Sequence, residues 1–102
     1  MSVTNMTSEN FKALTENAQV PVLIDFFAPW CSPCRMLSPI IDEIAEEAKA
    51  VKVCKVNIDE EQSLASRFSV MSVPTLVLIK ENRVSSMVGL RSKAEILEFI
   101  SK

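Results

Sequence analysis

The sequence predicts an α/β domain in which helices cover both faces of a mixed central β-sheet. Segments with helical and strand patterns alternate along most of the chain, as in domains with parallel strands. Near the carboxyl end two strand segments follow each other directly, which indicates a hairpin and an antiparallel pair. The chain has 102 residues, and we expect a single domain over residues 1–102. The expected order is helix 7–17, strand 20–28, helix 31–49, strand 51–58, helix 59–68, strands 75–80 and 84–88, and helix 94–101.

Each element in the first half has a local signal. Thr7 or Ser8 can act as the N-cap of the first helix, because their hydroxyl groups accept from free backbone N–H groups. Residues 20–28 form a nearly continuous apolar run, which is typical of a strand buried on both faces. In the helix 31–49 apolar residues recur at helical spacing opposite an acidic face, and Pro39 predicts a kink.

Capping and turn residues mark the boundaries in the second half. The second buried strand is followed by Asp59, which can cap the short helix after it. Asn82 is expected at positive φ in the turn between the last two strands, since asparagine tolerates this conformation. Ser92 and Glu95 have the spacing of a capping box before the last helix. A further short strand is expected near Val3.

Composition and charge argue against several functional classes. Apolar residues make up 48% of the chain, and the net charge of −2 gives no electrostatic reason to expect nucleic acid or an anionic membrane as partner. No apolar run approaches the roughly 18 residues needed to cross a bilayer. The amino terminus lacks the basic start and apolar stretch of a secretory signal. We therefore expect a cytoplasmic protein, whose three cysteines do not serve as structural staples.

Two cysteines lie three residues apart, after the first buried strand and at the start of the long helix. If Cys31 is the N-cap, its sulfur accepts from the N–H of Cys34, because Pro33 has no N–H. The positive helix end then favours the Cys31 thiolate, and the spacing also suits a disulfide. Half of a zinc site and accidental packing are the alternatives. Structural zinc needs four ligands, whereas the chain has no histidine and only Cys54 besides the pair, so dithiol–disulfide exchange is favoured.

A resemblance to the thioredoxin family is carried, in order and spacing, by residues 25–40 (DFFAPWCSPCRMLSPI), 56–59 (VNID), 73–80 (VPTLVLIK) and 88–93 (VGLRSK). It covers nearly the whole chain. It implies the thioredoxin fold, with about five strands flanked by about four helices, and a general protein-disulfide reductase. Cys31 would attack the target disulfide to form a mixed disulfide, and Cys34 would then attack Cys31 and release the reduced target. The family binds no cofactor itself and is usually regenerated by a flavin-dependent thioredoxin reductase that draws on NADPH.

Asp25 interrupts the first buried strand. From the residues alone it is either a carboxylate turned to a water-filled edge or a buried acid whose pKa is raised by desolvation. The resemblance favours the second interpretation, because the family carries a buried aspartate at this position. Such an acid could take the proton from Cys34 when that thiol attacks. The family also carries a lysine where Lys55 stands, so Asp25 and Lys55 are expected beside the cysteines as catalytic residues.

The docking surface for a target protein is expected around the cysteine pair. Trp30 directly precedes the nucleophile and is expected to be partly exposed beside its sulfur. General frequencies favour a trans Val73–Pro74 bond, but the dipeptide resembles the cis-proline of the family, where the preceding backbone pairs with an extended target segment. Gly89 is either a bulge or the family glycine that lines the same groove. The expected docking residues are Trp30, Ser32, Pro33, Val73, Pro74 and Gly89.

The sequence departs from the usual family pattern at several positions. Ser32 stands where the family has glycine, Phe27 replaces a common tryptophan, and Ser72 takes the place of a residue that is often glycine. Ser32 leaves the redox potential open. A hydroxyl that donates to a sulfur would stabilise the thiolate and make the protein more oxidising, whereas one that points to solvent changes little. Cys54 is interpreted as a small buried hydrophobic residue, with a regulatory thiol as the alternative.

Two other functional classes stay open at this point. A thioredoxin-fold oxidant or isomerase would be favoured by export, and a binding module would use the same groove without turnover. The expected partners are thioredoxin reductase and disulfide-containing clients such as ribonucleotide reductase, peroxiredoxin or methionine sulfoxide reductase. We expect a monomer, with no metal, nucleic acid or membrane as partner.

Overall fold

The structure is a computed structural model that describes residues 3–16 and 18–102. The elements follow in the order β1 (Val3–Asn5), α1 (Phe11–Thr15), β2 (Val22–Phe27), α2 (Ser32–Glu47), β3 (Lys52–Asn57), α3 (Gln62–Arg67), β4 (Thr75–Lys80), β5 (Arg83–Val88) and α4 (Lys93–Ser101). The strands form one sheet in the order β1-β3-β2-β4-β5. β3 runs parallel to β1 and β2, and β4 is antiparallel to β2 and β5. The predicted mixed sheet and the short strand at Val3 are confirmed.

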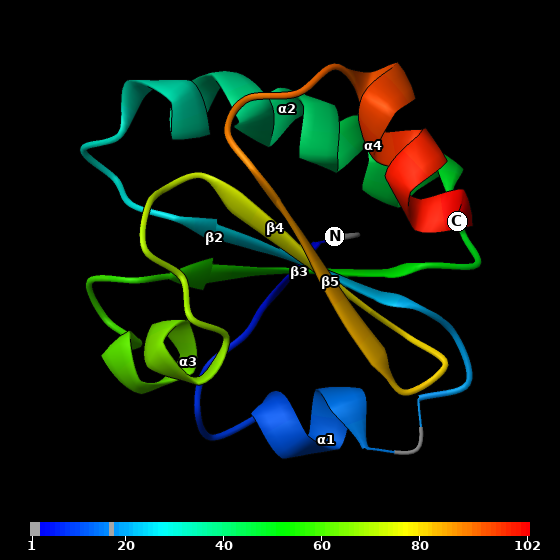
Figure 1. Cartoon of the computed structure of the whole chain (residues 1–102), viewed down its shortest axis with the longest axis horizontal. Coiled ribbons are helices and arrows are strands. Elements are labelled where there is room, and N and C mark those ends of the chain that lie inside the picture. The colour runs from blue at the N-terminus through cyan, green and yellow to red at the C-terminus, as the bar shows by residue number, and fades with distance from the viewer. Residues whose placement is uncertain (1–2, 17) are drawn as a thin grey trace.

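The sheet separates two hydrophobic cores, because side chains alternate between the faces along each strand. Helices α2 and α4 cover one face, and α1 and α3 cover the other (Figure 1). Asp25 points to the α2 face, since it is two residues from Leu23, which belongs to that core. The core under α2 and α4 includes Leu23, Leu37, Ile41, Ile44, Val53, Leu76 and Ile96. The core on the opposite face includes Met6, Val22, Ile24, Phe26, Val56, Leu64 and Val77.

The amino-terminal helix is shorter than predicted. α1 begins at Phe11, and its N-cap residue Asn10 makes no side-chain cap bond. Instead, the N–H of Thr7 donates to Asn10 Oδ1 at 2.7 Å, and the N–H of Asn10 donates to Thr7 Oγ1 at 3.3 Å. These reciprocal bonds close a turn ahead of the helix, so Thr7 binds backbone as a cap would, but not at the boundary of the assigned helix. The predicted end of the helix, Asn17, lies outside the described residues.

Asp59 does not cap the short helix, contrary to the prediction. α3 begins at Gln62, and its N-cap residue is Glu61, which makes no side-chain cap bond. The Asp59 carboxylate accepts from the indole of Trp30 instead. A partner that is close in space but distant in sequence therefore outweighs the local capping preference at this residue.

The predicted positive φ of Asn82 and the capping box of the last helix are confirmed, whereas β5 begins at Arg83, so the turn before it has two residues instead of the predicted three. Asn82 has a φ of 65° and Glu81 a φ of 52°, as in a two-residue hairpin turn. The capping box is complete, because the N–H of Glu95 donates to Ser92 Oγ at 3.1 Å and the N–H of Ser92 donates to Glu95 Oε1 at 3.0 Å. α2 continues through Pro39, and the kink predicted there stays a prediction.

Candidate active site

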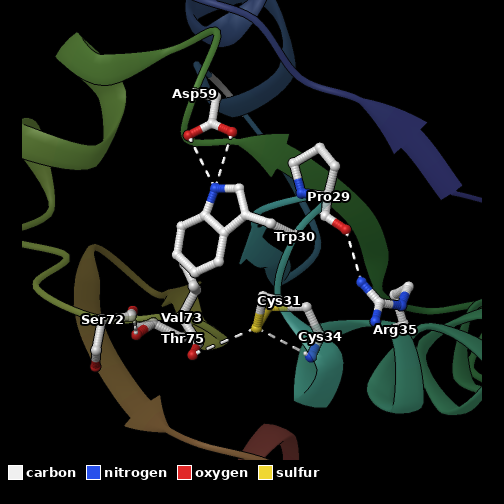
Figure 2. Close-up of a disulfide and its surroundings, with 9 residues drawn as sticks. All are labelled: Pro29, Trp30, Cys31, Cys34, Arg35, Asp59, Ser72, Val73 and Thr75. Carbon is white, nitrogen blue, oxygen red and sulfur yellow. Dashed lines mark hydrogen bonds between the residues drawn. A yellow bond between two sulfur atoms is a disulfide. The ribbon is translucent and has the colours of Figure 1, made fainter.

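The cysteine pair lies between the end of the central strand β2 and the start of α2. Cys31 is the N-cap of α2, and its Sγ accepts from the N–H of Cys34 at 3.2 Å (Figure 2). Pro33 lies in the first turn and has no N–H to offer. The two Cα atoms are 5.2 Å apart, and the sulfurs form a disulfide. The predicted cap geometry is confirmed, and the positive end of a 16-residue helix favours negative charge on the Cys31 sulfur.

Both cysteines are almost fully covered in this disulfide form. The exposed fraction is 5% for Cys31 and 3% for Cys34. The loop before β4 lies beside the first sulfur: Cys31 Sγ is 3.7 Å from the carbonyl oxygen of Val73 (Figure 2). The Val73–Pro74 peptide bond is cis, as the resemblance implies. The fold therefore brings together the expected nucleophile and the expected docking loop, which are 42 positions apart in the chain.

Trp30 is exposed, with 67% of its surface accessible, but its orientation is fixed by a hydrogen bond. Its Nε1–H donates to the Asp59 carboxylate, 3.1 Å from Oδ2 (Figure 2). On the other side of the loop, Arg35 Nη1 donates to the carbonyl of Pro29 at 2.8 Å. Sequence reasoning did not identify Asp59 and Arg35 as residues that hold this loop through hydrogen bonds. The topology contains the signal for Asp59, because the carboxyl ends of the parallel strands β2 and β3 meet at one edge of the sheet.

Asp25 is buried in the middle of β2, with an exposed fraction of 4%. Burial raises the pKa of its carboxyl group from an ordinary 3.8 to about 7, while the positive charge of Lys55 lowers it and the negative charge of Asp42 raises it. Its Oδ1 has no hydrogen-bond partner among the described residues. The structure thus agrees with the second interpretation, in which Asp25 is a buried acid and burial raises its pKa.

A cavity of about 290 Å³ lies between the buried acid and the cysteine pair. Asp25 and Cys34 both line it, and so does Lys55, which is the register partner of Asp25 on the neighbouring strand β3. A space of this size has room for water between the two groups. The complete lining is Asp25, Phe27, Ala28, Pro29, Cys34, Arg35, Ser38 and Lys55.

Gly89 follows β5 and lies against the docking loop. Its N–H donates to the carbonyl of Pro74 at 2.8 Å, and its φ is 95°. A Cβ atom at Gly89 would meet no heavy atom within 4 Å. In the free protein the requirement for glycine therefore comes from the backbone conformation rather than from crowding. The loop itself is closed by the Thr75 hydroxyl, which donates to the carbonyl of Ser72 at 2.7 Å.

The two remaining polar candidates have simple surroundings. Ser32 is exposed, like Pro33 beside it, and its hydroxyl has no hydrogen-bond partner among the described residues. Cys54 is fully buried, and burial raises the pKa of its thiol to about 11.

Across residues 3–16 and 18–102, no group of three or more histidine, cysteine or acidic side chains is placed to hold a metal ion. Within the same ranges, no helix is long and apolar enough to cross a membrane.

A disulfide-forming pair at a helix N-terminus, on this sheet and beside a cis-proline, defines a dithiol–disulfide oxidoreductase. Comparisons with known proteins narrow this class. The profile of the thioredoxin family matches residues 2–102. The thioredoxin of Pyropia yezoensis is 42% identical, covering 100% of this chain and 97% of its own length. That of Rickettsia felis is 44% identical over 96% and 95% of the two chains.

Solved structures agree with these relatives. Chloroplastic thioredoxin z superposes with a TM-score of 0.89 at 28% identity, covering 99% of this chain and 93% of its own. A single-residue mutant of the thioredoxin from Halobacterium salinarum also has a TM-score of 0.89, at 34% identity over 97% and 88% of the two chains. The chain belongs to the thioredoxin family. It is a thioredoxin-type protein-disulfide reductase that needs no bound cofactor and interacts with thioredoxin reductase and disulfide-containing targets.

Proposed function

We propose that Cys31 is the nucleophile that attacks client disulfides. The observation that carries this assignment is the 3.2 Å contact of its Sγ with the N–H of Cys34 at the start of α2. Reduced Cys31 held there as a thiolate attacks one sulfur of the client disulfide and forms a mixed disulfide, while the other client sulfur leaves as a thiolate. Cys34 then attacks Cys31 Sγ as a thiolate, the bond between Cys31 and the client breaks, and the second client sulfur leaves as a thiolate. The client receives two electrons in total, and the protein ends with the Cys31–Cys34 disulfide.

Asp25 is the proton acceptor for Cys34 in the second step. Two features support this role: both groups line one cavity, and the pKa of Asp25 is raised to about 7, which suits an acid–base group at neutral pH. As a carboxylate, Asp25 takes the Cys34 proton through water in the cavity. Lys55 assists, because its positive charge lowers the pKa of Asp25 and so keeps more of the carboxyl group ionised.

The client docks as an extended segment across the surface formed by Trp30, Ser32, Pro33, Val73, Pro74 and Gly89. The indole of Trp30 offers an exposed apolar face, held in place by Asp59. The carbonyl of Val73 lies 3.7 Å from Cys31 Sγ, so a client strand that pairs with the backbone of this loop brings its own sulfur to the nucleophile. Reductase activity with protein disulfides is thereby favoured over activity with small disulfides alone.

Residues 1–102 act as one domain and one monomer in the cytoplasm. There the protein carries electrons from NADPH, through the flavin-dependent reductase, to clients such as ribonucleotide reductase, peroxiredoxin and methionine sulfoxide reductase. The Cys34→Ser variant tests this proposal, because it can form the mixed disulfide but cannot resolve it. Clients are then expected to stay attached to Cys31 and to be released by dithiothreitol. The Cys31→Ser variant is the control and should trap no client. If Cys34→Ser also traps no disulfide-containing protein, the assigned roles are refuted.

A second measurement separates a reductase from an oxidant. The protein is equilibrated with glutathione buffers, and its turnover of insulin disulfides is then followed. A strongly reducing pair that turns over supports the reductase. A strongly oxidising pair would instead point to an oxidant or isomerase, and a reducing pair without turnover to a binding module.

A further inference from the structure

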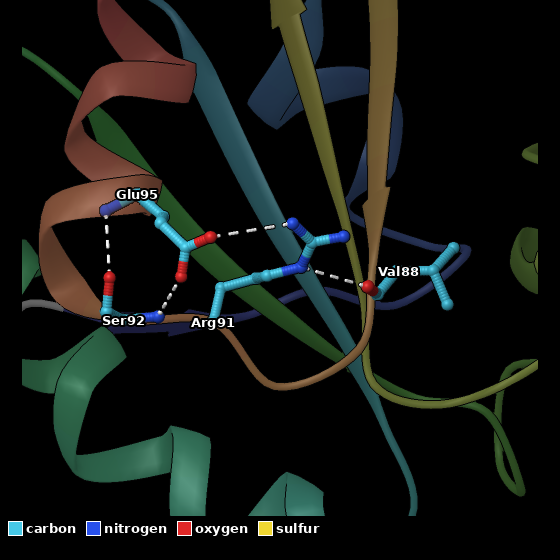
Figure 3. Close-up of polar contacts among 4 residues, drawn as sticks. All are labelled: Val88, Arg91, Ser92 and Glu95. Atoms are coloured by element: carbon cyan, nitrogen blue, oxygen red, sulfur yellow. Dashed lines mark hydrogen bonds and ion pairs between the residues drawn. The ribbon is translucent and has the colours of Figure 1, made fainter.

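The peptide unit between Val88 and Gly89 is held from both of its polar ends. Its N–H, which belongs to Gly89, donates to the carbonyl of Pro74 at 2.8 Å. Its carbonyl, which belongs to Val88, accepts from Nε of Arg91 at 3.2 Å (Figure 3). The same guanidinium extends towards α4, where its Nη1 lies 3.7 Å from Glu95 Oε2. Arg91 thus connects the end of β5 to the first turn of the last helix.

The strand register explains why the Val88 carbonyl is available to Arg91. Thr75 and Val88 are opposite each other in the antiparallel pair of β4 and β5. Because Gly89 and Pro74 form the hydrogen-bonded pair next to them, the N–H and carbonyl of Val88 point away from β4. β5 is the last strand of the sheet, so these groups face its open edge. The Arg91 guanidinium lies at that edge and donates to the Val88 carbonyl.

Glycine makes this peptide unit easy to rotate. Gly89 has a φ of 95°, and no heavy atom lies within 4 Å of where its Cβ would be. The glycine therefore contributes no side-chain contact and no strong φ preference that would restrain rotation on its side of the unit. The orientation of its N–H, and with it the bond to Pro74, depends on external partners. Among the described residues the structure provides one for each end of the unit, namely the Pro74 carbonyl and the Arg91 guanidinium.

We propose that Arg91 is a positioning residue of the docking surface, which acts by fixing the Val88–Gly89 peptide unit against the Pro74 loop. The inference rests on the proposed docking role of Val73, Pro74 and Gly89. Glu95 in α4 forms an ion pair with Arg91 through Oε2, while its Oε1 accepts from the N–H of Ser92 in the capping box. A surface that is already ordered loses less conformational entropy when an extended client binds. Arg91 therefore increases affinity for protein clients and leaves the thiol chemistry unchanged.

The test compares one substrate that docks with one that does not. The pre-reduced protein is mixed with excess insulin, whose disulfides lie in a polypeptide, or with dithiobis(nitrobenzoate), a small aromatic disulfide. For Arg91→Ala we expect the half-saturating insulin concentration to rise about 3- to 10-fold, the range that corresponds to the loss of one ordinary hydrogen bond at an exposed position. The maximal rate with insulin and the rate constant with the small disulfide are expected to stay at the wild-type values.

Graded variants separate positioning from charge and from fold. Arg83→Ala removes the same charge at the other end of β5, where the side chain is exposed, and is expected to behave like the wild type. Arg91→Lys can donate to the Val88 carbonyl but cannot also reach Glu95 in the fork geometry, so it should rescue in part. Glu95→Gln keeps the acceptor of the capping box, loses the ion pair, and should fall between the wild type and Arg91→Ala.

Amide hydrogen exchange reads the proposed cause directly. In the wild type the Gly89 amide donates to the Pro74 carbonyl and should exchange slowly. Arg91→Ala is expected to speed its exchange several-fold while amides in the centre of β4 are unaffected. The proposal is overturned if Gly89 exchange is unchanged, if Arg83→Ala raises the insulin concentration equally, or if the small disulfide is slowed as much as insulin. If the wild-type protein reduced the small disulfide but not insulin, the proposed docking role of Val73, Pro74 and Gly89 would be refuted. That outcome is distinct from those that overturn the role of Arg91.

Discussion

Asp25 and Lys55 are register partners at the centre of the sheet, on the neighbouring parallel strands β2 and β3. Both side chains line the cavity that reaches Cys34, and Lys55 Nζ also lies 5.8 Å from the centre of the Phe27 ring. Two effects change the pKa of the Asp25 carboxyl group in opposite directions: burial raises it, and the positive charge of Lys55 lowers it. Burial dominates, so the carboxyl group changes its charge close to neutral pH, where the proposed proton transfer takes place.

Replacing Asp25 with asparagine should slow resolution of the mixed disulfide. The amide cannot accept the Cys34 proton, and loss of a positioned base typically costs about 100- to 10,000-fold in rate. In the wild type the rate should rise as pH increases through about 7, where Asp25 loses its proton, and Asp25→Asn should lack this inflection. Stopped-flow release of a client from a preformed mixed disulfide measures the step. An unchanged rate and pH profile in the variant would exclude Asp25 as the base.

Lys55→Met tests the role of Asp25 by changing the pKa of its carboxyl group while the group itself is kept. Without the positive charge the pKa of Asp25 should rise further above its ordinary value, because burial is then less opposed. The inflection in the resolution rate should therefore move to higher pH while the rate at high pH is largely retained. An inflection that stays in place would show that Lys55 does not act through the charge of Asp25.

The buried Asp25 should also make the stability of the oxidised protein depend on pH. The folded protein holds the Asp25 proton more tightly than the unfolded chain, with a pKa of about 7 against 3.8, so the contribution of Asp25 to stability is fully present below about pH 4 and is lost as pH rises through about 7. The fall is on the order of 4 kcal/mol, since each pKa unit corresponds to about 1.4 kcal/mol. Urea unfolding of Asp25→Asn should show a flatter profile and a more stable protein at pH 8.

The three cysteines of the reduced protein should differ strongly in reactivity. Cys31 has its sulfur at the helix N-terminus, whereas Cys54 is fully buried and the pKa of its thiol is raised to about 11. At pH 7 we expect iodoacetamide to modify Cys31 at least about 100-fold faster than Cys54, since the thiolate is the reacting species. Mass spectrometry of peptides over time measures this. In guanidinium chloride the two rates should become similar, and fast modification of Cys54 in the native protein would contradict the assignment.

The sequence predicts those features of this site that depend on local pattern. The apolar runs identify β2 and β3, and the spacing of Cys31 and Cys34 around Pro33 predicts the cap geometry that the structure has. Features that depend on tertiary contacts could not be derived in this way. The alternation of side chains left Asp25 between a buried and a water-exposed position until the neighbouring elements were known. Arg91 gave no local signal at all, because its partner is a backbone carbonyl whose direction depends on the register of β4 and β5.

Asp59 is a further example of a tertiary contact that the sequence did not predict. Its local pattern indicated a helix cap, but its partner is Trp30, which is distant in sequence. Asp59→Ala should free the Trp30 indole, whose Nε1–H donates to the carboxylate at 3.1 Å. Both residues are at the surface, so we expect the free energy of unfolding to change by less than about 1 kcal/mol. The half-saturating concentration of insulin should rise about 2- to 5-fold, because the apolar face offered to the client is no longer oriented.

Fluorescence provides the independent readout for this change, since Trp30 is the only tryptophan of the chain. Its anisotropy should fall in Asp59→Ala. Glu60→Ala is the matched control, because it removes another exposed acid, next to Asp59, that makes no bond to the indole. If both variants lower the anisotropy and raise the insulin concentration equally, the effect comes from the charge of this loop and not from the hydrogen bond.

Ser32→Gly addresses the position where the chain departs from the usual family pattern. A residue changes the reduction potential only if it interacts differently with the thiolate and with the disulfide, and the Ser32 hydroxyl is exposed without a hydrogen-bond partner among the described residues. We therefore expect the potential to move by less than about 10 mV. Equilibration with glutathione buffers, followed by quantification of the two redox forms, measures it. A serine that donated to the Cys31 thiolate would stabilise the reduced form, and its removal would lower the potential by about 30 mV for each 1.4 kcal/mol lost. A shift of that size would show that the hydroxyl turns towards the sulfur when the disulfide is reduced.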